Sequence, residues 1–480
     1  MRSDLNSNPH PRARVYEKNP THSWQSDFSK AVSTSGDLAP GGPTHRPNLR
    51  RVMKRHSIAM IAPCPFPANY GTPGAIREMC ETLSTRGHRV HVVTYPFGEN
   101  LPVGSAKVWR SWYWRKQDRL HAGPSCKKLL LDLFLLLTVC RVIRSQRIDV
   151  IHGHNYEGVL IGFVAKLITG KPLIYNAVNL MADELPSYHF IKPAFLAAPI
   201  ARFLDLVVAK LPDYFIAVTN ELQRSLIGLG APAERIRFVA CGVKGRMFDK
   251  GDPVTLRARY EIGQRPVVMY TGINSPFQRI DHLLRAFRLT LQEEPTALLM
   301  VVSPLKHDPD VAANRQMAES LGISQSVRWI EGQTLAELPD YLAMATVAVI
   351  SRPEVPGHPI KLLNYMAAAK PIVCFEGAAK GVRHMQEAYV VCDHDWQTLG
   401  FGILTLMRDP ELAARLGKRA KQMVLRDFDW ARLCRKIEDV YDAVTIGARE
   451  PSTVSGVPKR RTAPHGHADF ETVKRPTSML

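Results

Sequence analysis

The sequence predicts an α/β protein made of two Rossmann-like halves, each with a parallel sheet. Short apolar segments that suit buried strands alternate with amphipathic helical segments in two successive series along the chain. In addition, residues 357–373 (GHPIKLLNYMAAAKPIV) run from a glycine turn into a short helix starting at Pro359 and then into an apolar strand. That layout is typical of a phosphate-binding helix N-terminus in an open α/β sheet.

The first series follows a polar, proline-rich tail at 1–55, which we expect to be disordered. A doubly wound parallel sheet is the default for such a series. We assign it to a domain at 56–241. Its predicted strands are 57–62, 90–94, 149–152, 173–176 and 214–218, and its predicted helices are about 75–86, 156–169 and 194–210, with a loop at 63–74.

The second series follows a glycine-rich, charged segment at 242–253, which we interpret as an interdomain linker. We assign it to a domain at 254–426. Its predicted strands are 267–271, 298–302, 327–330, 347–350 and 371–375, and its predicted helices are about 281–292, 311–321, 335–343 and 359–368. A last amphipathic helix at 427–447 is expected to pack back across the first domain, and 448–480 is a second disordered tail. Two facing domains leave a cleft at the carboxyl ends of their strands.

Composition and charge limit the compartment and the partners. The chain has 480 residues, of which 45% are apolar, and eight cysteines without metal-ligand spacing, so we expect a reducing compartment and no structural zinc. The net charge is +19, and the two tails carry nine of these charges. Such a surplus favours anionic lipid, phosphorylated substrates or nucleic acid, or serves solubility alone. Since no nucleic-acid-binding module is visible and the N-terminus lacks a secretory signal, we expect a cytoplasmic protein without a nucleic-acid partner.

One apolar segment leaves two alternatives open. Residues 129–143 (LLLDLFLLLTVCRVI) include two charges and fall short of the roughly 20 residues that span a bilayer. Lysines and arginines flank the segment within 127–147. It is either a buried core helix or a basic helix lying in the plane of an anionic membrane, on the cytoplasmic face.

The helix at 359–368 offers a candidate anion site. Lys361 lies in its first turn, and Asn364 and Tyr365 follow at i+3 and i+4, which we predict to be the ligand side, opposite Leu362, Leu363 and Met366. Free amides, the positive end of the helix dipole and the ammonium group together suit a diphosphate. The alternative is an ordinary capped helix with a solvated lysine.

Seven segments, in this order, carry a family resemblance that extends over about 57–445. They are 71–94 (GTPGAIREMCETLSTRGHRVHVVT), 149–155 (DVIHGHN), 241–248 (CGVKGRMF), 270–287 (YTGINSPFQRIDHLLRAF), 329–334 (WIEGQT), 351–361 (SRPEVPGHPIK) and 356–373 (PGHPIKLLNYMAAAKPIV). The chain resembles the retaining glycosyltransferases of family 4, which have the GT-B fold of two facing Rossmann-like domains and a C-terminal crossover helix. It is a variant whose EX7E region reads PGHPIKLLN.

The resemblance implies a retaining, metal-independent glycosyltransferase. Its donor is a nucleoside diphosphate sugar, used as a co-substrate without any further cofactor. Its acceptor is expected to be lipid-linked or a polysaccharide. The alternatives are a catalytically impaired sugar-nucleotide-binding or scaffold protein of the same fold and, third, a sugar-nucleotide epimerase.

The resemblance also implies roles for individual residues. His154 matches the histidine near the transferred sugar, with His152 as its neighbour, and either histidine could instead be a polar cap of its strand. Donor contacts are implied for Gly71, Gly74, Gly272, Gly357, His358 and Lys361. Acceptor-side candidates, in the loop after 173–176, are Asn179, Asp183 and Glu184.

Three departures from the family pattern alter the expected contacts with the donor. Asn364 stands where the second glutamate of EX7E is expected, and keeps hydrogen-bonding capacity without the charge. Pro356 stands where the first glutamate of EX7E is expected, so Glu354 is the substitute that could reach the sugar. The arginine and lysine expected after Gly272 fall on Ile273 and Gln278, which leaves Arg279 as the nearest cation.

Overall fold

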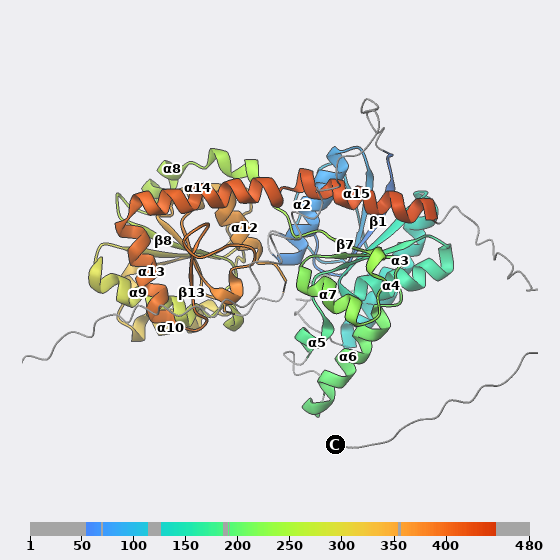
Figure 1. The fold of residues 1–480 in the computed structure, drawn as a ribbon, viewed down its shortest axis with the longest axis horizontal. Helices are drawn as coiled ribbons and strands as arrows, with labels where there is room; N and C mark the ends of the chain where they lie inside the picture. Colours follow the sequence, from blue (N-terminus) through green and yellow to red (C-terminus); the bar gives the residue numbers. More distant parts are fainter. Residues whose placement is uncertain are drawn as a thin grey trace, which may run out of the picture.

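The computed structural model describes residues 54–68, 71–113, 126–185, 191, 193–353 and 357–447. Two α/β lobes lie side by side, and two long C-terminal helices follow one another along them (Figure 1). Helix α14 (Pro410–Asp427) lies along the C-terminal lobe, and α15 (Trp430–Gly447) lies along the N-terminal lobe. This is the predicted α/β fold with two parallel sheets. Apart from residues 54 and 55, the predicted tails at 1–55 and 448–480 lie outside the described residues.

The N-terminal lobe contains a seven-stranded parallel sheet in the order β3-β2-β1-β4-β5-β6-β7. The inner strands are buried on both faces, which explains their nearly continuous apolar sequences. The direction in which strands are added reverses between β1 and β4. The strands are β1 (Ser57–Ala62), β2 (Arg89–Thr94), β3 (Lys107–Arg110), β4 (Val150–His154), β5 (Leu173–Ala177), β6 (Tyr214–Ala217) and β7 (Ile236–Phe238).

Helices cover both faces of this sheet. On one face lie α3 (Cys126–Ser145), α4 (Asn155–Thr169) and α6 (Ala197–Val208), and on the other α2 (Gly71–Thr85) and α15 (Figure 1). The predicted start of the first helix, at about residue 75, is wrong, because α2 begins at Gly71. Short helices follow β5 and β6, namely α5 (Met181–Glu184) and α7 (Asn220–Gly228). Of the helices in the described ranges, none has the length and apolar content that a membrane crossing requires.

The C-terminal lobe contains a six-stranded parallel sheet in the order β10-β9-β8-β11-β12-β13. Its strand order reverses between β8 and β11. The strands are β8 (Val267–Thr271), β9 (Leu298–Val302), β10 (Val327–Ile330), β11 (Val347–Ile350), β12 (Ile372–Phe375) and β13 (Tyr389–Val391). The helices are α8 (Pro253–Arg259), α9 (Ile280–Glu293), α10 (Val311–Ser320), α11 (Leu338–Met344), α12 (Ile360–Ala367) and α13 (Trp396–Arg408).

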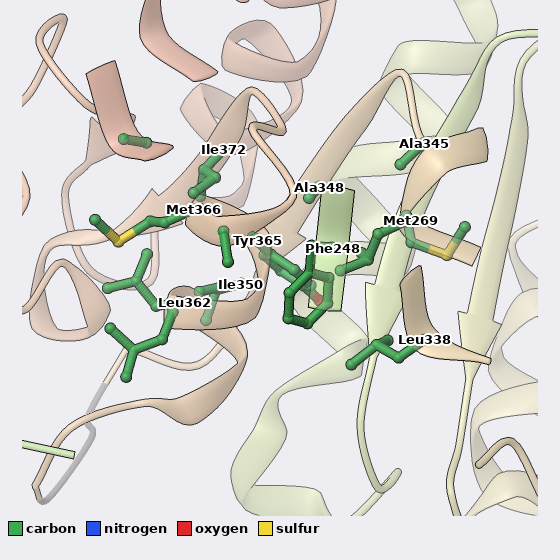
Figure 2. Close-up of a cluster of buried hydrophobic side chains, with 14 of the residues drawn as sticks. Phe248, Met269, Leu338, Ala345, Ala348, Ile350, Leu362, Tyr365, Met366 and Ile372 are labelled. Carbon is green, nitrogen blue, oxygen red and sulfur yellow. The ribbon is translucent and has the colours of Figure 1, made fainter. Parts of the chain in front are cut away.

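The segment 242–253 between the lobes is packed rather than free. Phe248, in the 3-10 helix η4 (Gly245–Lys250), inserts among Met269, Leu338 and Tyr365 in a core of the C-terminal lobe (Figure 2). The return crossing pairs with it, since the Val243 amide donates to the Phe428 carbonyl at 2.9 Å. The two chain crossings between the lobes therefore lie side by side.

Candidate functional site

The carboxyl ends of β8 and β11 form the first half of the candidate site. In open parallel sheets, ligands bind outside the carboxyl ends of the strands where the strand order reverses. Gly272 directly follows β8, and Arg352 is the second residue after β11. Helix α12 begins nearby in the chain, and the connection between Arg352 and that helix includes residues 354–356, which lie outside the described residues. The predicted candidate Glu354 falls in this gap, as does Pro356, which stands where the first glutamate of EX7E is expected.

Lys361 projects from the first turn of α12 to the loop after β8. Its Nζ donates to Tyr270 Oη at 2.8 Å and to Gln278 Oε1 at 2.9 Å, and lies 4.0 Å from the centre of the Tyr270 ring. Both hydrogen-bonding partners are neutral, and within the described residues no carboxylate forms an ion pair with this ammonium. Burial and the neighbouring charge of Arg352 lower the pKa of Lys361.

Arg352 is the cation that sequence reasoning missed. Its guanidinium lies 4.7 Å from the centre of the Phe277 ring, and its charge acts on Lys361. Arg279, the cation predicted to serve the donor, instead forms an ion pair with Asp281 at 2.8 Å, and its Nη1 is 3.5 Å from His394 Nδ1. A lone arginine just after a predicted strand was the signal available in the sequence.

Gly272 has a conformation that its neighbours require. Its φ is +134°, a region that residues with a side chain rarely adopt, and a Cβ at this position would lie 2.9 Å from Lys361 Nζ. The glycine therefore leaves room for the ammonium group beside the loop. Gly71 and Gly74 lie in the first turn of α2, rather than in the predicted loop.

The N-terminus of α12 has no side-chain cap among the described residues. Gly357 makes the predicted turn with φ +73°, and Pro359 is the N-cap. The amides of Ile360 and Lys361 therefore have no acceptor within the helix. Asn364 is buried, and its side chain makes no hydrogen bond to another described residue.

The predicted ligand side of α12 is wrong for Tyr365. This side chain is fully buried in the core shown in Figure 2, and its hydroxyl accepts a 2.8 Å hydrogen bond from the Thr271 amide. Residues i and i+4 share one side of a helix, and here that side packs on the end of β8: Lys361 reaches Tyr270, and Tyr365 one turn later reaches Thr271 in the core. Tyr365 thereby fixes the end of β8 against α12, which positions both Gly272 and Lys361.

The second half of the candidate site is the carboxyl end of β4, beside the strand-order reversal of the N-terminal sheet. His154 ends β4 and is fully buried, and its Nδ1 lies 3.0 Å from Asn176 Nδ2 on β5. Its Nε2 is buried and has no hydrogen-bonding partner within the described residues. Burial, with a smaller effect of His152, places the pKa of His154 well below its ordinary value, so the ring is neutral near pH 7.

His152 packs against the ring of His154. The two rings stack with their centres 4.5 Å apart, because residues i and i+2 of a strand share a face. His152 Nδ1 lies 2.8 Å from Tyr441 Oη on the crossover helix α15, and burial lowers the pKa of His152 to about 3. Each histidine thus has a partner at Nδ1, whereas Nε2 of both rings is buried without a hydrogen-bonding partner among the described residues.

The two halves meet where the loop after β5 touches the turn at Gly357. A Cβ at Gly357 would lie 3.1 Å from the Val178 carbonyl oxygen, so the lobes are in direct contact there. A pocket of about 150 Å³ opens at this contact, lined by Asn179 and Asp183 from the N-terminal lobe and by Gly357 and Lys380 from the C-terminal lobe. Glu184 ends α5 close by and does not line the pocket.

His358 lies between the lobes. Its ring centre is 5.1 Å from that of Phe428, and both ring nitrogens are buried without a hydrogen-bonding partner among the described residues. Burial lowers the pKa of His358 to about 4. Gly357 and His358, which the sequence predicted as donor contacts, thus lie at the junction between the lobes. Within the described ranges, no group of three or more histidine, cysteine, aspartate or glutamate side chains is placed to hold a metal ion.

Two family models match the sequence over most of the two lobes. The model described as Glycosyltransferase Family 4 matches residues 71–244, in the N-terminal lobe. The model described as Glycosyl transferases group 1 matches residues 255–423, in the C-terminal lobe.

Individual proteins are similar at low identity. A D-inositol 3-phosphate glycosyltransferase from Thermobispora bispora is 27% identical over 312 residues, which cover 62% of this chain and 70% of the relative. A GDP-mannose-dependent alpha-(1-6)-phosphatidylinositol monomannoside mannosyltransferase from Mycobacterium tuberculosis is 24% identical over 310 residues, covering 62% and 78%. The solved structure of Anabaena HepE in complex with UDP and glucose superposes with a TM-score of 0.65 at 17% identity, covering 81% of this chain and all of HepE.

Proposed function

Since the chain belongs to glycosyltransferase family 4 and is a GT-B glycosyltransferase that uses a nucleotide sugar, we propose that it transfers the sugar with retention of anomeric configuration. The proposed acceptor is lipid-linked or a polysaccharide. The donor diphosphate binds at the N-terminus of α12, and the sugar extends toward His154.

The observation that carries the proposal is the pair of cations at the strand-order reversal of the C-terminal sheet. Lys361 and Arg352 lie close enough for the charge of one to lower the pKa of the other, and Lys361 has only neutral partners in the described part of the chain. A buried ammonium group with neutral partners alone favours an anion beside it. A diphosphate supplies that anion, and the amides of Ile360 and Lys361 add two donors.

These groups also suit the departure of a nucleoside diphosphate. When the bond to the sugar breaks, negative charge grows on the leaving phosphate oxygen, and preorganised cations and amides stabilise it. We propose that Lys361 and Arg352 do this without an obligatory metal ion. Asn364, buried one turn into α12, is proposed to hydrogen-bond the ribose through its amide.

His154 is proposed to orient the transferred sugar. A buried ring nitrogen without a partner favours a hydroxyl group that supplies one, since an unpaired buried polar atom costs about 1–3 kcal/mol. The ring is neutral near pH 7, so it acts by hydrogen bonding rather than by charge. The acceptor is proposed to enter beside Asn179, at the pocket between the lobes.

The names of the relatives support the donor and acceptor classes. HepE was solved with UDP and glucose, and the mycobacterial relative is named as a GDP-mannose-dependent enzyme acting on a phosphatidylinositol mannoside. We therefore propose a UDP- or GDP-sugar as the donor and a lipid-linked glycan as the first acceptor to test.

The test is a panel of UDP-, GDP- and ADP-sugars, each measured for thermal stabilisation of the protein and for release of the nucleoside diphosphate with membrane extract as acceptor. One donor should raise the unfolding temperature and be turned over, and the anomeric proton of the product should show the configuration of the donor. Stabilisation without turnover would favour the alternative of a catalytically impaired sugar-nucleotide-binding protein. An inverted product would exclude retention.

A further inference from the structure

One side of the N-terminal lobe is unusually apolar. Large apolar side chains that are exposed number 21 among the described residues, and 13 of them lie on α3, α4 and the segment formed by the 3-10 helix η2 (Ala194–Leu196) and α6. We call the outer surface of these elements the α3–α4–α6 face. The described part of the C-terminal lobe between β8 and α13 exposes only Phe277, Met385 and Phe401.

Helix α6 has its apolar side turned outward. Ala197, Ala201 and Asp205 face the protein, whereas Ile200 and Phe203 face the solvent, and Phe203 is 64% exposed. A surface helix of a globular protein normally shows the reverse arrangement.

The orientation of α6 is fixed by Asp205. Its carboxylate accepts hydrogen bonds from Tyr156 Oη at 2.7 Å and from the amides of Met181 and Ala182 at 2.9 Å. These three donors stabilise the buried charge, so rotating α6 to hide Phe203 would break all three hydrogen bonds. The hydrogen bonds of Asp205 therefore keep the apolar side of α6 at the surface.

The other two helices contribute the same pattern. On α3, Leu129, Leu133 and Leu137 are exposed at intervals of four residues, and on α4 Leu160 and Val164 follow the same interval. α3 packs against α4, and α4 against α6, on one face of the sheet (Figure 1). Since each helix connects two parallel strands, all three run in the same direction, and the starts of the helices lie at the cleft end of the lobe.

The exposed charges on this face have one sign. Among the side chains of α3 and α6 that the structure describes, the exposed charged ones are Arg141, Arg144 and Arg202. Each acid on the three helices is engaged within the protein: Asp132 accepts from Tyr95 Oη at 2.5 Å, Glu157 pairs with Lys128 at 3.2 Å, and Asp205 is bonded as described above. On α3, Arg141 and Arg144 continue the stripe begun by Leu129, Leu133 and Leu137.

We propose that the α3–α4–α6 face docks on an anionic lipid bilayer. The exposed apolar side chains along the face enter the boundary between headgroups and acyl chains, and the arginines contact anionic headgroups. The charge argues against a second copy of the chain as the occupant, because pairing this face with itself would oppose arginines to arginines. Docking goes beyond glycosyl transfer, since binding to vesicles requires neither donor nor acceptor.

The test is sedimentation of the full chain with two kinds of vesicle. One is made of phosphatidylcholine alone, and the other also contains about 30% phosphatidylglycerol, which gives the membrane a strong negative surface potential. The wild type should bind the anionic vesicles, and binding should weaken as NaCl is raised, since salt screens surface charge. Phe203→Ser combined with Leu206→Ser should lower the partition coefficient at least about tenfold, because two inserted side chains are lost. Arg141→Gln combined with Arg144→Gln should lower it on anionic vesicles by about five- to tenfold per charge.

A matched control is Phe401→Ser on α13, where the side chain is 59% exposed. This variant should bind vesicles like the wild type, and all variants should keep the unfolding temperature of the wild type because the changed side chains are on the surface. No binding of the wild type to anionic vesicles, or equal binding of the Phe203 and Phe401 variants, would overturn the proposal. A wild-type dimer that Phe203→Ser dissociates would also overturn it, in favour of a second copy on this face.

Discussion

Lys361 shows how single residues arrange the proposed donor site. Tyr270, Gln278 and Gly272 position its ammonium, and Arg352 adds a second positive charge. Burial of the ammonium group, which lowers the pKa of Lys361, is costly, and the proposed diphosphate would offset that cost. Both predictions at this scale follow from that arrangement.

Lys361→Ala should weaken donor binding by about 1.5–3 kcal/mol, the range of a charge-assisted hydrogen bond, which corresponds to about ten- to a hundredfold in Kd. Isothermal titration with the donor identified in the panel measures this change. Lys418→Ala, an exposed lysine on α14, is the matched control and should bind the donor like the wild type. Equal affinity of the two variants would exclude Lys361 from the diphosphate site.

Gly272→Ala should reduce donor affinity although alanine adds only one carbon atom. The new Cβ meets Lys361 Nζ at 2.9 Å, and the φ of +134° strains any residue with a side chain. Gly263→Ala isolates the strain, because Gly263 has φ +57° and open space around a Cβ. The control should lose about 1 kcal/mol of unfolding free energy and keep its donor affinity, whereas Gly272→Ala should lose affinity as well. Loss of stability alone at Gly272 would contradict the expected displacement of Lys361.

At the scale of elements, α15 belongs to the N-terminal lobe although the end of the chain supplies it. Trp430 Nε1 donates to Glu78 Oε2 on α2 at 2.9 Å, and Tyr441 Oη lies against His152 on β4. The first contact also depends on pH. Burial raises the pKa of Glu78 to about 7, against the opposing effects of the Trp430 hydrogen bond and of Lys244.

Glu78→Gln should therefore change how stability depends on pH. The folded pKa of about 7 exceeds the ordinary 4.5, so the stabilisation that Glu78 gives when protonated is fully present below pH 4.5 and is lost as the pH rises to 7. The variant keeps an oxygen to accept from Trp430 and carries no titrating proton. Its stability relative to the wild type should rise between pH 4.5 and 7, by at most about 3 kcal/mol.

Thermal unfolding of both proteins at pH 5 and pH 7 measures this difference. Glu319→Gln, at an exposed position on α10, is the control and should show the same pH dependence as the wild type. A difference between Glu78→Gln and the wild type that stays constant over this range would show that Glu78 does not titrate there.

The sequence predicted the elements whose local pattern is strong. VVMYT and LLMVV, in β8 and β9, are buried runs that admit few alternatives, and both strands were found where expected. KVWR, IRF and YVV, in β3, β7 and β13, are edge strands of three or four residues, so pairing with a neighbour decides them rather than their own composition. The same limit applies to the site. Lys361 follows a recognisable glycine turn in the sequence. Arg352 comes near Lys361 only because β11 lies beside β8, which the sequence does not show directly.

At the scale of the whole molecule, the chain crosses twice between the lobes, and the second crossing returns α15 to the N-terminal lobe. The outgoing crossing at Val243 hydrogen-bonds to the return crossing at Phe428, and α15 then completes the core on one face of the N-terminal sheet. The C-terminal lobe encloses its own cores around both faces of its sheet. The N-terminal lobe therefore depends on residues that follow the C-terminal lobe in sequence, while the C-terminal lobe has no such dependence on α15.

Leu433→Ala in α15 tests this asymmetry. Leu433 is buried in the core shared with β1 and β4, so the cavity should cost about 2–5 kcal/mol. Hydrogen exchange should then accelerate in β4 more than in β9, because local opening follows the stability of each cooperative unit. Ile403→Ala in α13 is the matched change, in a core of the C-terminal lobe, and should accelerate β9 instead. If Leu433→Ala accelerated β4 and β9 equally, the two lobes would open as one unit, and α15 would act as a clamp on both rather than as part of the N-terminal core.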